Sequence, residues 1–78
     1  MAADNFARFQ KCAAQVLSTS EDKIIREANL REDFGADSLD LVELINALEK
    51  EFDIDVAEDA LEGVETVGEA FSLVQSRL

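Results

Sequence analysis

The sequence contains no histidine, proline, tryptophan or tyrosine, and it has a single cysteine, Cys12. Histidine is the commonest general base and the commonest zinc ligand, so we expect no catalytic residue and no metal site. One cysteine cannot form an intrachain disulfide, which fits a reducing compartment. Basic residues are also scarce, 7 against 18 acidic ones, and the net charge of −11 disfavours binding to nucleic acid or to anionic membranes.

The chain also lacks long apolar runs. No segment approaches the roughly 20 residues of a membrane span, and the N-terminus has no basic region followed by an apolar stretch, so it is not a secretory signal. A length of 78 residues leaves room for one small domain, and a hydrophobic content of 47% is typical of a globular protein. We therefore expect a single domain over residues 1–78. Without a signal or a membrane span we expect a cytoplasmic protein, and because the sequence begins at Met1 we expect it to be free-standing. We also expect a monomer.

Four segments show helical period, and three of them predict well-formed amphipathic helices. The first runs from Phe6 to Leu17, with Asp4 as its N-cap. The second runs from about Ser38 to Phe52 and places one apolar arc toward a core: Leu41, Leu44, Ile45, Leu48 and Phe52. The last begins with a capping box, Thr66 and Glu69, and carries these apolar positions: Val67, Phe71, Val74 and Leu78.

The segments between these helices are less regular. A loop of about 17 residues follows the first helix, longer than most loops in compact domains, and four apolar residues are spaced to pin it to the core: Ile24, Ile25, Leu30 and Phe34. Gly35 then permits a sharp turn. Val56 to Val64 predicts one short, weak helical turn that ends at Gly63. The fold class is therefore all-α, a small bundle of three main helices plus one short helix, softened by its uncompensated negative charge.

Ser38 is the first residue with possible chemistry. Asp37 is a good N-cap, and Asp40 favours the helix dipole three residues later, so the Ser38 hydroxyl is not needed for capping. Leu39 falls on the polar side of the second helix, where it resembles an interface anchor rimmed by the acids Asp40 and Glu43. Local physics leaves two interpretations open, an ordinary helix-start serine and a functional hydroxyl.

The residues Gly35-Ala-Asp-Ser-Leu-Asp40, with Val42-Glu-Leu44 and Ala47-Leu-Glu-Lys-Glu-Phe52, resemble the signature of the acyl carrier protein family. The resemblance covers nearly the whole chain, including the long loop, the short third helix and a final helix that opens with Thr-Val-Gly. It implies that Ser38 is the attachment point of 4′-phosphopantetheine, transferred from coenzyme A by a phosphopantetheinyl transferase. The arm would carry acyl groups as thioesters, and the protein itself would not be an enzyme.

The resemblance also implies two groups of residues around Ser38. Positions that match the family's recognition helix, whose acids meet basic docking patches on acyl-transfer, condensing and reducing enzymes, are Asp37, Leu39, Asp40, Val42, Glu43 and Glu49. Positions that match the slot sheltering the acyl chain are Leu48, Val56, Leu61 and Val64.

Three positions depart from the family's usual pattern. Ala57 replaces a proline before the third helix, Asn46 replaces a more apolar residue, and Lys50 interrupts an acidic run. Fatty acid biosynthesis is the expected pathway. Since Asn46 and Lys50 lie on the recognition helix, a dedicated carrier of a polyketide or other specialised pathway stays open.

Other classes explain the sequence less well. A calcium-binding EF-hand that begins at Asp53 would lack the required glycine at position 6 and glutamate at position 12. A Cys12 nucleophile would have no histidine partner, and Cys12 is expected to be a buried small hydrophobe. An unmodified acidic interaction module, with no special role for Ser38, is the remaining alternative from a different class.

Overall fold

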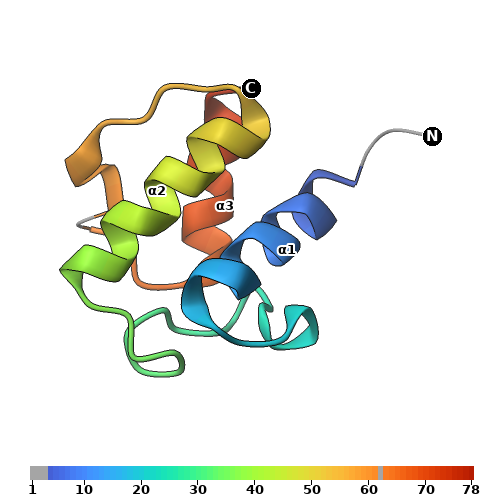
Figure 1. The fold of residues 1–78 in the computed structure, drawn as a ribbon, viewed down its shortest axis with the longest axis vertical. Helices are drawn as coiled ribbons and strands as arrows, with labels where there is room; N and C mark the ends of the chain where they lie inside the picture. Colours follow the sequence, from blue (N-terminus) through green and yellow to red (C-terminus); the bar gives the residue numbers. More distant parts are fainter. Residues whose placement is uncertain (1–3, 62) are drawn as a thin grey trace.

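The computed structural model describes residues 4–61 and 63–78, which form three α-helices and two short 3₁₀ turns (Figure 1). The elements are α1 (Asn5–Leu17), η1 (Glu21–Lys23), α2 (Ser38–Phe52), η2 (Glu58–Leu61) and α3 (Val67–Ser76). The only β-structure in the described ranges is an isolated bridge between Asn29 and Thr66. The predicted all-α bundle is confirmed, and η2 is the weak turn predicted between Val56 and Val64.

The helices start where the sequence predicts, because side chains satisfy the free N–H groups of their first turns. Asp4 accepts a hydrogen bond from the backbone N–H of Ala7 at 3.2 Å. Thr66 accepts one from the N–H of Glu69, and the Glu69 carboxylate accepts two in return, from the N–H groups of Glu65 and Thr66. These two bonds hold the pKa of Glu69 below its ordinary value.

One hydrophobic core joins the three helices to the long loop. Its largest fully buried side chains come from every part of the fold: Phe9, Ile24, Leu30, Leu44, Leu61, Val67 and Val74. At one end, the rings of Phe6 and Phe9 pack edge-on against Phe71, with centroids 5.0 and 5.5 Å away. The Arg26 guanidinium lies over Phe6 and Phe71 at 4.5 and 5.1 Å. The cation covers this aromatic cluster while its charge stays accessible to water.

The loop between α1 and α2 extends from Ser18 to Asp37, slightly beyond its predicted bounds, and crosses one end of the bundle in cyan to green (Figure 1). Ile24 and Leu30 are completely buried and Phe34 packs against the core, as predicted. The prediction for Ile25 is wrong, since its side chain is 48% exposed. The backbone turns at Ile24, where the N–H of Ile25 donates to the carbonyl of Lys23 at 3.0 Å, so burial of Ile24 leaves Ile25 toward solvent.

Backbone hydrogen bonds tie this loop to the start of α3. The N–H of Leu30 donates to the carbonyl of Glu65 at 2.8 Å, and the N–H of Gly68 donates to the carbonyl of Arg26 at 3.0 Å. A Cβ atom at Gly68 would lie 3.2 Å from that Arg26 carbonyl oxygen, so glycine allows the close approach. The loop is therefore a structured part of the fold, and it leads into α2 from a fixed position.

The C-terminus differs from the prediction. α3 ends at Ser76, and Leu78, predicted to continue its apolar face, is 56% exposed. The helical period no longer applies after the helix ends, so the spacing from Val74 to Leu78 does not bring Leu78 back to the core.

Candidate functional site

Ser38 is the first residue of α2, and the chain around it is closely held. Gly35 has φ +67°, the left-handed conformation that glycine adopts most readily. Ala36 is buried, and its N–H donates to the carbonyl of Leu30 at 3.1 Å. Asp37 then accepts a hydrogen bond from the N–H of Asp40 at 2.9 Å. The turn, the buried alanine and the cap together fix the direction in which Ser38 leaves the loop.

Asp37 and Asp40 form a reciprocal capping box, because the Asp40 carboxylate accepts a hydrogen bond from the N–H of Asp37 at 3.3 Å. The sequence predicts the cap at Asp37 but gives Asp40 only a role in the helix dipole. The i, i+3 spacing of the two acids is the sequence signal for this capping box. It differs from the usual pattern because aspartate stands where glutamate or glutamine is typical. Two otherwise free N–H groups are thus satisfied beside Ser38.

The Ser38 side chain is exposed. Within the part of the chain that the structure describes, its hydroxyl makes no hydrogen bond, and the N–H groups of Ser38 and Leu39 have no acceptor. Those N–H groups lie at the positive end of the α2 dipole, where an anionic group is stabilised. The hydroxyl is therefore accessible, and the two N–H groups are available to the oxygens of a phosphate ester attached to it.

The first turns of α2 place five of the six predicted recognition residues near Ser38; we name these five the recognition face: Asp37, Leu39, Asp40, Val42 and Glu43. Leu39 is 66% exposed, the highest fraction among the large exposed hydrophobic side chains of the described residues. Asp37 and Glu43 are exposed, whereas Asp40 and Val42 are half-buried. An exposed leucine bordered by acids is suited to a surface that combines an apolar pocket with cations.

The sixth predicted recognition residue, Glu49, lies near the other end of α2 and is half-buried. Its carboxylate accepts a hydrogen bond from the N–H of Val56 at 2.7 Å. This contact joins the helix to the loop that precedes η2. The structure thus gives the Glu49 carboxylate an intramolecular partner, which distinguishes it from the exposed carboxylate of Glu43.

The four predicted slot residues lie in the hydrophobic core or pack against it. Leu48 on α2 and Leu61 on η2 are each 2% exposed, and α2 and η2 are in contact. Val56 and Val64, on either side of η2, are partly buried and pack against the same core. Leu48 and Leu61 are thus core residues, whereas Val56 and Val64 are only partly covered.

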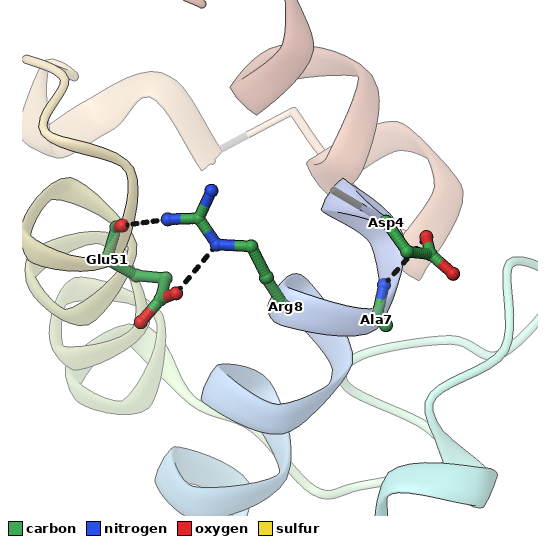
Figure 2. A network of polar contacts seen from close by, with 4 residues as sticks. All are labelled: Asp4, Ala7, Arg8 and Glu51. Carbon is green, nitrogen blue, oxygen red and sulfur yellow. Dashed lines mark hydrogen bonds and ion pairs between the residues drawn. The ribbon is translucent and has the colours of Figure 1, made fainter. Parts of the chain in front are cut away.

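A contact that the sequence does not predict joins α1 to the end of α2. The Arg8 guanidinium donates to the Glu51 carboxylate at 2.9 Å and to the Glu51 carbonyl at 2.5 Å (Figure 2). It also lies 4.6 Å from the centre of the Phe52 ring. The two ends of this contact are 43 residues apart, so no local sequence signal could have revealed it. It braces α2, the helix that carries Ser38.

The remaining candidate group, Cys12, is buried at 8% exposure, which confirms its predicted place in the core. Burial raises the pKa of the Cys12 thiol, and the negative charge of Glu51 raises it further. Among the side chains that the structure describes, no cluster of histidine, cysteine, aspartate or glutamate is placed to hold a metal ion. No helix in the described part of the chain has the length and apolar character needed to span a bilayer.

The fold and site define a small acidic helical protein that presents a serine hydroxyl at the start of a helix. A family model described as "Phosphopantetheine attachment site" matches residues 7–73. The chain is 43% identical over 75 residues to an acyl carrier protein of Phenylobacterium zucineum (strain HLK1), covering 96% of this chain and 95% of the relative. It is 48% identical over 68 residues to an acyl carrier protein of Saccharopolyspora erythraea, covering 87% and 72%.

The chain therefore belongs to the acyl carrier protein family, and its cofactor is a covalently attached 4′-phosphopantetheine. Members of this family carry acyl groups between acyl-processing enzymes and are not themselves enzymes. The expectation drawn from the Asp-Ser-Leu motif is confirmed at the level of the family and of its cofactor.

Proposed function

We propose that Ser38 is the residue to which the 4′-phosphopantetheine is attached, and that the chain acts as one carrier domain over residues 1–78. The observation that carries this assignment is the exposed Ser38 hydroxyl at the first position of a capped helix. The unshared N–H groups of Ser38 and Leu39 support it, because they can donate to the oxygens of a phosphodiester. When bound, the arm supplies a terminal thiol that holds acyl groups as thioesters.

In this proposal the protein's own residues position the attachment point and do no chemistry. The capping box of Asp37 and Asp40 keeps the first turn of α2 formed, so the Ser38 hydroxyl is presented in one direction to a phosphopantetheinyl transferase. The recognition face then serves the transferase and the acyl-transfer, condensing and reducing enzymes in turn. Leu39 enters an apolar pocket and Glu43 pairs with basic side chains around it.

The slot residues would shelter the acyl chain while it travels between enzymes. In this proposal the buried Leu48 and Leu61 provide apolar surface, and the partly buried Val56 and Val64 form the edge where the chain enters. Apolar residues at this position favour a hydrocarbon chain because its burial removes apolar surface from water.

We propose fatty acid biosynthesis in the cytoplasm, by a monomeric carrier, as the pathway. A dedicated carrier of a polyketide or other specialised pathway is the second candidate, and a specific observation favours it: Asn46 and Lys50, which depart from the family's pattern, are both exposed on α2. Loading assays with malonyl and specialised acyl groups would separate the two pathways.

The test is the intact mass of the protein after incubation with coenzyme A, magnesium and a broad-range phosphopantetheinyl transferase. We expect wild type to gain one phosphopantetheine unit and Ser38→Ala to gain none. Ser72→Ala, which removes another exposed helical hydroxyl, is the matched control and should gain the unit like wild type. No gain in wild type, with the transferase active on a second carrier, would refute the assignment and favour an unmodified acidic interaction module.

A further inference from the structure

Glu49 holds the loop after α2 through both its backbone and its side chain. Its carbonyl accepts hydrogen bonds from the N–H groups of Asp53, the C-cap residue, and of Ile54. Its carboxylate reaches further along the chain and accepts from the N–H of Val56 at 2.7 Å. The first two bonds end the helix, but the third determines where the following segment lies.

The side-chain bond has the properties of a structural contact. The donor–acceptor distance is short and the acceptor is charged, which makes such a bond about twice as strong as one between neutral groups. Both residues are half-buried, so the bond is partly shielded from water. Glu43, on the same helix and exposed, makes no side-chain hydrogen bond within the described residues. The two glutamates therefore differ in what their carboxylates do.

The position of Val56 gives this bond its consequence. Val56 is partly buried and packs against the core two residues before η2, and it is one of the residues of the proposed acyl slot. Asp53 has φ +56°, a left-handed conformation of the kind that commonly ends a helix, so the loop turns away from α2 at this residue and a contact further along can hold it close to the helix. The Glu49 carboxylate provides such a contact three residues later.

We propose that Glu49 is a positioning residue that holds Val56, and with it the loop from Asp53 to Ala57, against α2, and so closes the edge of the acyl slot. The carboxylate is committed to this intramolecular bond, so the acid that meets basic partner surfaces is Glu43 and not Glu49. The effect on the acyl chain rests on the proposed function, whereas the effect on the loop does not.

The first experiment uses the unmodified protein. Amide hydrogen exchange measured by NMR would compare wild type with Glu49→Ala, Glu49→Gln and Glu43→Ala. In Glu49→Ala we expect the Val56 amide to exchange at least about tenfold faster, as for loss of a hydrogen bond to a charged group. Exchange at Ala13 in α1, the internal reference, should be unchanged. Glu49→Gln should restore part of the protection, since its side-chain oxygen still accepts, and Glu43→Ala should match wild type.

The second experiment uses carriers loaded with an octanoyl group and follows cleavage of the thioester by hydroxylamine. We expect faster cleavage in Glu49→Ala, an intermediate rate in Glu49→Gln, and the wild-type rate in Glu43→Ala. The KM of the transferase for the carrier should respond to the other residue: we expect Glu43→Ala to raise it and Glu49→Ala to leave it unchanged. If neither wild type nor any variant can be loaded with the acyl arm, but the exchange results are as expected, the assignment of Ser38 fails while the role of Glu49 in holding the loop stands.

Three results would overturn the proposal. Unchanged Val56 exchange in Glu49→Ala would show that the carboxylate does not hold the loop. Equal acceleration at Val56 and Ala13 would show a general loss of stability. A wild-type cleavage rate combined with a raised KM in Glu49→Ala would return Glu49 to the set of docking acids.

Discussion

Replacing Asp37 with alanine tests how the start of α2 supports the modification of Ser38. The substitution removes the acceptor of the Asp40 N–H at 2.9 Å and keeps only the reciprocal bond, in which the backbone N–H of residue 37 donates to the Asp40 carboxylate. Loss of an N-cap side chain costs about 1 kcal/mol, within a range of about 0.5–2 kcal/mol. For a domain of this size, that corresponds to a Tm lower by about 4–8 °C.

Asp37 also carries a charge on the recognition face, so a second variant must separate the cap from the charge. Asparagine caps a helix about as well as aspartate, so Asp37→Asn should keep most of the stability while it removes the charge. Thr66→Ala is the matched control at the capping box of α3. It should lower the Tm by a similar amount without affecting the first turn of α2.

The assay combines thermal unfolding, followed by circular dichroism, with the kcat/KM of the phosphopantetheinyl transferase, measured well below every Tm. We expect Asp37→Ala to lose both stability and several-fold in transfer, because its frayed first turn presents Ser38 poorly. Asp37→Asn should lose less of both, and Thr66→Ala should lose stability alone. If Asp37→Ala and Asp37→Asn lost the same Tm and the same kcat/KM, the role of the cap would be refuted. If Thr66→Ala lost as much kcat/KM as Asp37→Ala, the loss would be explained by lower global stability.

Three further predictions concern stability. Arg8→Ala should lower the free energy of unfolding by about 1–2 kcal/mol in urea melts, because it removes the Glu51 ion pair and the contact with Phe52; Lys11→Ala, an exposed neighbour, should change it by less than about 0.5 kcal/mol. The lowered pKa of Glu69 stabilises the fold above the unfolded-state pKa, and this contribution is lost as pH falls through the folded-state pKa. The Tm difference between wild type and Glu69→Gln should therefore shrink on acidification; a constant difference would contradict this. Added salt should raise the Tm, because the Debye length of about 10 Å at 0.1 M is similar to the radius of gyration of 11.2 Å; a Tm independent of salt would refute charge repulsion as a destabilising factor.

The elements around Ser38 could be predicted because they depend on nearby residues. The cap at Asp37, the turn at Gly35 and the apolar arc of α2 each arise from interactions within about four positions of the chain. The same holds for the capping box at Thr66. Ser38 could therefore be recognised as a helix-start residue with a spare hydroxyl, and its resemblance to a family motif supplied the chemistry.

Side chains outside regular helices were harder to place. Ile24 and Ile25 have similar hydrophobicity, so composition cannot decide which one is buried; the exit from η1 and the fit against the core decide it. The spacing of Leu78 is helical, but the helix ends before that residue. In both cases the apolar pattern indicated which residues could be buried, and the packing of other elements selected among them.

The sequence by itself thus determined the three helices, their caps, most of the core and the position of Ser38, because short-range hydrogen bonds and a repeating apolar pattern specify these features. Only the tertiary structure decided that Arg8 braces the end of α2 from 43 residues away and that Glu49 faces the N–H of Val56. Both contacts depend on how the chain returns after a turn or a loop. The path of the chain through such a turn or loop results from the packing of the whole molecule, and no local pattern of residues specifies it.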